Sequence, residues 1–241
     1  MSAAGPDPVV RIGPGTAADL LALLPLHYRA APPRGVVCVL AARDTAGDLV
    51  GVLAVSMPTL NSPVRDLAWP GRYRTGRPRD DARRLNDEVR TISRVMVAPA
   101  WRRRGVAQRL VRAYLASPLT PATEAIAALG TRSRFFEHAG MVRYDLAPGP
   151  ARARLADALA FAGLRAGALR GPGRAAAFAR LPTRRRRLLE RELRQWAAAS
   201  RATRRLARGP VADLLAAAGS ALRGARACGY AHTATAGGAS W

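Results

Sequence analysis

The chain has 241 residues, a length that suits one ordinary domain with an appendage or two small domains. Its formal net charge of +23 arises from 39 basic residues, all of them arginine, against 16 acidic residues. A charge of this size predicts attraction to nucleic acid, nucleotides or anionic surfaces. The two cysteines, Cys38 and Cys228, are too few for a disulfide framework or a cysteine metal cluster, so we expect a reduced, cytoplasmic protein without a metal.

The longest apolar stretches, such as residues 211–222, are too short and too rich in alanine to span a bilayer. The first residues also lack a basic segment followed by an apolar run, which would be typical of a secretion signal. We therefore expect neither secretion nor association with a membrane.

Residues 9–57 carry signals for short strands and one capped helix. Three apolar segments predict strands: residues 9–12, 35–43 and 49–57. Thr16 with Asp19 three positions later is typical of a helix N-cap, and leucines follow at once. Asp44 and Gly47 lie between the second and third strands and have the chemistry of a tight turn, which predicts a hairpin.

Residues 59–90 form a charged insert without a regular period of apolar residues. It holds eight arginines and five acids. Loops of this length in a compact domain are usually functional or disordered. Two interpretations stay open, a solvated insert and a flap over a substrate.

A strand and a helix are predicted on either side of Gly105. Residues 91–97 alternate apolar and polar side chains, as in a strand, and Pro99 ends this pattern. After Gly105 the apolar residues recur at spacings of three and four, which predicts a helix as far as residue 115.

The turn between this strand and this helix is predicted to bind an anion. The backbone amides of residues 103–107 would lack partners within the helix and would point out of its positive end. Arginines at positions 102–104 add positive charge, while Gly105 and Ala107 leave the amides accessible.

Residues 122–146 predict a strand, a short helix and a second strand. The first strand covers residues 122–129, and the helix covers residues 132–139 with Gly140 as its left-handed cap. Residues 141–146 then return as a strand.

Residues 151–230 predict a basic helical extension, and residues 231–241 predict a disordered tail because they are small and polar. From residue 151 onward the chain holds 18 arginines against four acids. Leu189, Leu193 and Trp196 form an apolar stripe on a predicted helix. We expect this stripe to pack against the first domain or against the second subunit of a homodimer. Binding of nucleic acid by the basic face stays open beside these alternatives.

Two motifs resemble those of a known family. The pattern Val97-x-Pro99-x-x-Arg102-x-x-Gly105-x-Ala107 is similar to motif A of the GNAT superfamily of acyl-CoA-dependent N-acyltransferases. Residues 134–141, with the sequence RFFEHAGM, are similar to the late helix-to-strand signature of the same family. The resemblance covers residues 9–146 and implies a GNAT-like domain over residues 1–148.

This resemblance implies an α/β (α+β) fold, with a mixed, mainly antiparallel central sheet flanked by helices and followed by the helical extension. It also implies N-acyl transfer with acetyl-CoA or another acyl-CoA, whose pantetheine arm lies between the motif A strand and the next strand. The implied cofactor-binding residues are Val95, Met96, Val97, Arg102, Arg103, Arg104, Gly105, Val106, Ala107 and Phe136.

The family's usual catalytic groups are not all present. Phe136 replaces a tyrosine that often protonates the thiolate, and Ser93 with Arg94 stands where a glutamate is common. The resulting candidates for catalysis are Ser93, Arg94, Glu88 and Tyr144, with Ser133 or water as other proton donors and Asp87 or Glu124 as other bases. Arg94 would favour an anionic acceptor, or would be structural, paired with Asp87 or Glu88.

Two finer resemblances bear on function. Residues 85–94 resemble GNAT domains attached to ABC-type ATPases, and the Ser93-Arg94 pair has a faint likeness to phage Mom-type DNA modifiers. With the net charge, the second likeness implies an alternative function: binding or modification of DNA or tRNA on a diverged GNAT scaffold.

Overall fold

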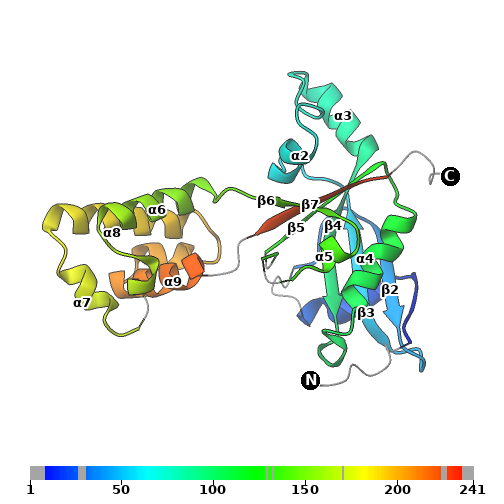
Figure 1. The fold of residues 1–241 in the computed structure, drawn as a ribbon, viewed down its shortest axis with the longest axis horizontal. Helices are drawn as coiled ribbons and strands as arrows, with labels where there is room; N and C mark the ends of the chain where they lie inside the picture. Colours follow the sequence, from blue (N-terminus) through cyan, green and yellow to red (C-terminus); the bar gives the residue numbers. More distant parts are fainter. Residues whose placement is uncertain are drawn as a thin grey trace. The chain divides into compact units, whose positions relative to one another are not determined.

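The computed structural model describes residues 9–26, 31–128, 130–131, 133–169, 171–223 and 227–234. The chain divides into two compact units (Figure 1). The first unit combines residues 1–146 with residues 226–241, and the second unit is residues 147–225.

The described part of the first unit contains one seven-stranded sheet in the order β1-β2-β3-β4-β5-β7-β6. The strands are β1 (Arg11–Pro14), β2 (Val36–Arg43), β3 (Leu49–Ser56), β4 (Val89–Val97), β5 (Ala122–Ala127), β6 (Val142–Asp145) and β7 (Cys228–Thr233). All neighbours are antiparallel except β4 and β5, which are parallel. The predicted mixed, mainly antiparallel sheet flanked by helices is thus confirmed.

Helices cover both faces of this sheet. They are α1 (Ala17–Leu23), α2 (Pro63–Ala68), α3 (Pro78–Glu88), α4 (Val106–Ala116) and α5 (Phe135–His138), with short 3-10 helices η1 (Leu24–Leu26) and η2 (Pro99–Trp101). Since two parallel strands need a crossover connection, α4 links β4 to β5. It packs Val106 and Leu110 on one face, whereas α1 packs Leu20 and Leu23 on the other.

A glycine in β3 allows α4 to lie close to the sheet. A side chain at Gly51 would place its Cβ 3.1 Å from Val106 Cγ1 and 3.2 Å from Leu110 Cδ1. These contacts are tighter than ordinary van der Waals packing, so the helix that follows motif A is seated directly against the β3 backbone.

The charged insert contains more regular structure than the sequence indicated, because α2 and α3 both lie within it. Pro63 and Pro78 each begin a helix, a position where the missing amide costs nothing. Few apolar side chains hold these helices: Val64 of α2 is fully buried, and Leu85 of α3 packs with Val89 and Tyr73. So few apolar anchors explain why no hydrophobic period was visible in the sequence.

The prediction for the end of the chain differs from the structure. Residues 228–230 were expected in a helical extension and residues 231–241 in a disordered tail, but β7 inserts between β5 and β6 and is antiparallel to both. Tyr230 is fully buried there and stacks on Phe136 with ring centroids 4.8 Å apart. Residues 235–241 lie outside the described residues. The second unit is therefore an insertion between β6 and β7.

The inserted unit is helical in its described residues. It comprises α6 (Pro150–Phe161), η3 (Ala166–Leu169), α7 (Arg174–Ala179), α8 (Thr183–Ala198), η4 (Arg204–Arg208) and α9 (Val211–Arg223). The predicted stripe of Leu189, Leu193 and Trp196 is buried in the core of this unit, together with Leu155 and Leu214. Its helices thus bury their apolar faces against one another.

The predicted N-cap of α1 is a complete capping box. Thr16 Oγ1 accepts a hydrogen bond from the Asp19 amide at 3.2 Å, and the Asp19 carboxylate accepts one from the Thr16 amide at 2.9 Å. Arg43 Nη2 lies 2.6 Å from the same carboxylate. The bond from the Thr16 backbone is the main influence that lowers the pKa of Asp19 below its ordinary value of 3.8, while burial opposes it.

A pH-dependent stability follows for Asp19. Because its pKa is lower in the folded protein, the ionised carboxylate stabilises the fold above the unfolded pKa, and this contribution is lost as the pH falls through the folded value. Asp19→Asn should lower the free energy of unfolding by about 1 kcal/mol at neutral pH and by much less in acid, measured by urea titration. Asp48→Asn, at an exposed position, is the control and should have little effect at either pH. An Asp19→Asn effect that did not depend on pH would contradict this account.

Candidate functional site

The site begins where β4 and β5 separate. Their parallel pairing runs only from Val89 opposite Ala122 to Ile92 opposite Ala125. Beyond this point β4 continues to Val97 beside β3, and β5 continues beside β7. One edge of β4 is therefore released from the sheet after Ile92.

A bulge marks the same place. On the β3 side, Ala54 pairs with Arg94 and Val55 pairs with Ile92, so Ser93 is an extra residue in β4. Such a bulge bends a strand and increases its local twist, which accounts for the separation of the two parallel strands.

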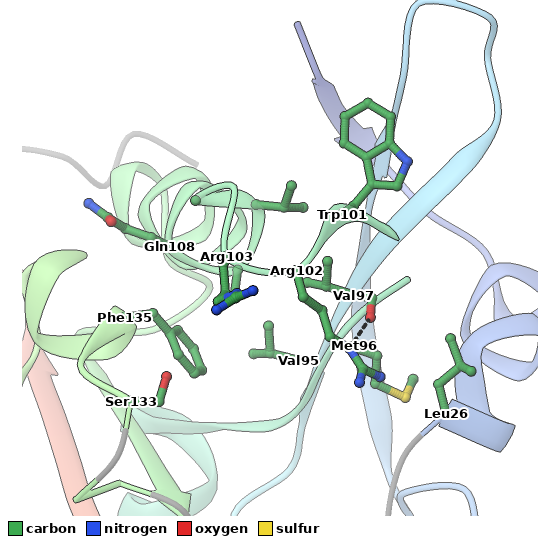
Figure 2. Close-up of a pocket in the computed structure, with 13 residues that line it drawn as sticks. Leu26, Val95, Met96, Val97, Trp101, Arg102, Arg103, Gln108, Ser133 and Phe135 are labelled. Carbon is green, nitrogen blue, oxygen red and sulfur yellow. Dashed lines mark hydrogen bonds between the residues drawn. The ribbon is translucent and has the colours of Figure 1, made fainter. Parts of the chain in front are cut away.

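A pocket of about 400 Å³ lies beside the released part of β4 (Figure 2). It is lined by Leu26, Val95, Met96, Val97, Trp101, Arg102, Arg103, Gly105, Val106, Ala107, Gln108, Ser133 and Phe135. In Figure 2, Ser133 and Phe135 lie on one side and the β4 residues on the other, with Arg103 between them. The pocket is thus bounded by β4, the turn after it, the start of α4 and the segment that enters α5.

The turn into α4 has a special backbone. Arg103 and Gly105 both adopt the left-handed conformation, with φ of 62° and 73°. Within the part of the chain that the structure describes, no side chain caps α4, and a Cβ placed on Gly105 would meet nothing within 4 Å. The first turn of α4 therefore opens its positive end toward free space, as an anion site requires.

Two arginines of this turn have other contacts. Arg102 donates from Nε to the Val97 carbonyl at 3.2 Å, which ties the turn to the end of β4. Arg104 lies over the Trp101 ring, 5.5 Å from its centroid, and does not line the pocket.

Most residues predicted to hold the cofactor do line the pocket. The two exceptions are Arg104 and Phe136. Phe136 is 4% exposed and belongs to the core, whereas its neighbour Phe135 faces the pocket. The sequence showed an aromatic pair but not which member points inward. Leu26, Trp101 and Gln108 were missed, since nothing in their local pattern indicates a shared cavity.

The four predicted catalytic residues lie outside the pocket lining. Ser93 Oγ lies 2.7 Å from Ser56 Oγ and donates to the Ala54 carbonyl at 3.1 Å. Arg94 donates from Nη1 to the Ser93 carbonyl at 2.7 Å and from Nη2 to the Ala31 carbonyl at 3.2 Å. Arg94 thus connects β4 to the segment that precedes β2.

Glu88 and Tyr144 are placed apart from this pocket as well. Glu88 ends α3 and accepts from Arg72 at 2.8 Å and from Tyr73 at 3.2 Å. Burial, and secondly the Glu88 charge, raise the pKa of Tyr73 to about 12, so its phenol remains a donor at neutral pH. Tyr144 lies on β6, opposite Gly229 of β7.

Ser133 is the polar candidate that the structure does bring into the pocket. The sequence offered it only as an alternative proton donor. Within the described residues its hydroxyl has no hydrogen-bond partner, and it lies beside Phe135 across the pocket from Val95 (Figure 2). The hydroxyl is therefore available to a bound molecule.

The described residues also bear on two other kinds of site. They contain no group of three or more His, Cys, Asp or Glu side chains placed to hold a metal ion. None of the described helices combines the length and the apolar character needed to cross a membrane.

The mixed sheet has parallel strands that separate at a bulge, beside a helix that opens its positive end into a pocket, and this architecture is consistent with the GNAT fold. Comparison with known families agrees: residues 15–134 match the model of the acetyltransferase (GNAT) family. The match ends before α5 and so leaves out β6, the inserted helical unit and β7. A search of curated proteins found no match. The likenesses to ABC-ATPase-associated domains and to Mom-type modifiers stay predictions.

Proposed function

We propose that the protein is an N-acyltransferase that uses acetyl-CoA as its acyl donor. A GNAT domain supports acyl-CoA-dependent N-acyl transfer in general. The observation that carries the proposal is the pocket, which extends from the uncapped start of α4 along the released edge of β4 to Ser133.

The pocket residues fit such a donor. The amides of residues 103–107 and the neighbouring arginine side chains would hold the pyrophosphate, because the helix end is positive and the space at Gly105 is open. The backbone of residues 95–97 would hold the pantetheine arm, since β4 has no strand partner on that side beyond Ile92. Phe135 would cover the arm from the opposite wall.

The reaction requires a proton at the departing sulfur. When bound, the cofactor supplies the activated acyl group as a thioester. In such a transfer the acceptor nitrogen would form a bond to the acyl carbon and lose a proton, while the carbon–sulfur bond would break and the sulfur would need a proton. We assign the donation to sulfur to the Ser133 hydroxyl, because it is the unpaired hydroxyl that lines the pocket in the described residues.

For the acceptor we propose an anionic or nucleic-acid-linked amine. The net charge of +23 supports this class, since it concentrates anions around the protein. Of the two roles left open for Arg94, acceptor recognition and a structural role, we assign it the structural one, because its guanidinium donates to the Ala31 carbonyl beside the bulge.

A label-transfer assay tests the function. Labelled acetyl-CoA is incubated with the protein and with separate fractions of small amines, peptides, tRNA and DNA, and label should appear in one acceptor class. Ser133→Ala should lower kcat at least about tenfold with little change in acetyl-CoA affinity, and Ser133→Thr, which keeps a hydroxyl, should retain most of the rate. Absence of transfer to every fraction would contradict the proposal.

A further inference from the structure

The inserted helical unit has a hollow of its own. Its volume is about 700 Å³, and it is lined by Phe161, Thr183, Arg184, Arg187, Leu188 and Arg191. Phe161 ends α6 and the other residues belong to α8, and these two helices pack against each other (Figure 1). Neither the family match nor the proposed acyl transfer uses this hollow.

Three guanidinium groups stand in a row along it. Arg184, Arg187 and Arg191 are three and four positions apart, so they share one face of α8. At 1.5 Å per residue the row is about 10 Å long. A row of this length can meet more than one phosphate of a polymer, and the guanidinium fork suits phosphate oxygens.

The row has little compensating charge within the part of the chain that the structure describes. Among the described residues, no ion pair or hydrogen bond engages the side chain of Arg184 or Arg187. Arg191 forms an ion pair with Glu192 at 3.3 Å, and that carboxylate is shared with Arg154, which lies 3.7 Å from it. The first turn of α8 contains no acid, although the positive end of a helix disfavours cations. Such a concentration of charge is locally unfavourable unless an external anion neutralises it.

An aromatic ring lies beside the row. Phe161 is 52% exposed, and the guanidinium of Arg185 lies 5.6 Å from its ring centroid. Leu188 adds apolar surface to the same hollow. A positive groove combined with an exposed ring is the combination that binds unpaired nucleotides, whose bases stack on the ring while their phosphates meet the charges.

We propose that this hollow binds a single strand of nucleic acid. The phosphates contact Arg184, Arg187 and Arg191, and one base stacks against Phe161. An acidic peptide would leave the ring without a stacking partner, and a flat membrane surface would not enter a concave site. A duplex keeps its bases paired and so offers no free base to Phe161.

The test measures binding of the whole chain to a labelled oligothymidylate of about 12 nucleotides by fluorescence anisotropy. The variant R184A/R187A/R191A should bind at least about tenfold more weakly, and its salt slope should fall by about 2, since each lost phosphate contact removes about 0.7. Phe161→Ala should weaken binding about tenfold. A duplex of the same length should bind more weakly to the wild-type protein and should be insensitive to Phe161→Ala.

A matched control distinguishes binding at this hollow from non-specific electrostatic attraction between the basic unit and nucleic acid. The variant R201A/R204A/R205A removes the same charge from exposed arginines of the same unit and should weaken binding less than about threefold. Circular dichroism and thermal unfolding establish that each variant is folded. Equal losses in the two triple variants, or no binding by the wild-type protein, would overturn the proposal. A different result is that the protein sediments with phosphatidylcholine–phosphatidylserine vesicles only when Arg184, Arg187 and Arg191 are present, and fails to bind the oligonucleotide. That result would overturn the proposal in favour of a membrane surface.

Discussion

Replacing Gly105 by aspartate should abolish saturable binding of acetyl-CoA in a calorimetric titration, with an affinity loss of at least about 100-fold. The carboxylate would stand at the open end of α4, where the amides of the first turn are expected to receive a pyrophosphate. It would both occupy those amides and repel the ligand. The fold should tolerate the change at a modest cost, because a Cβ at Gly105 meets no atom within 4 Å and aspartate is one of the few residues that adopt the left-handed conformation required there.

Gly105→Asn is the matched control for this prediction. Asparagine has nearly the same shape as aspartate and tolerates the left-handed conformation that φ of 73° requires, but it carries no charge. Its affinity loss should be about tenfold or less, and both variants should unfold at similar temperatures. Wild-type affinity in Gly105→Asp would contradict the assignment of the anion site. Equal losses in the two variants would show that shape, and not charge, governs access.

Replacing Arg65 by methionine should lower the free energy of unfolding by about 3–5 kcal/mol in urea titrations. Arg65 of α2 and Glu124 of β5 form an ion pair at 2.7 Å, and each side chain is only 3% exposed. Arg65 also donates to the carbonyls of Leu60 and Thr59 at 3.0 and 2.8 Å. Its removal would leave a buried carboxylate whose remaining hydrogen-bond partner among the described residues is the Thr91 hydroxyl at 3.2 Å.

The double variant Arg65→Met/Glu124→Leu tests this explanation. If the buried, unpaired charge is the main cost, removing both partners should restore a large part of the lost stability, because two apolar side chains then fill the site. Arg74→Met, which breaks an exposed pair with Asp66, is the control and should cost less than about 1 kcal/mol. A double variant no more stable than Arg65→Met would mean that the bonds to the two carbonyls dominate.

The sequence alone determined the local features of this protein. The capping box of α1, the β2–β3 hairpin and the strand, turn and helix around Gly105 each depend on residues within a few positions of one another. Their signals are therefore complete in a short window: a side chain that caps, a glycine that adopts positive φ, a proline that ends a strand. The two family motifs are local for the same reason, and most of the predicted cofactor residues do line the pocket.

Only the tertiary structure decided features that depend on distant partners. β7 is a strand because it fills the space between β5 and β6, about a hundred residues away in sequence from β5, and that contact buries Tyr230 against Phe136. The same packing turns Phe136 inward and leaves Phe135 to face the pocket. Ser133 lines the pocket that opens because β4 and β5 separate after Ile92. Ser93, which lies at the bulge, instead forms a hydrogen bond with Ser56. A strand pairing, a side-chain direction and a shared cavity are set by burial against the rest of the fold, and no short segment carries that information.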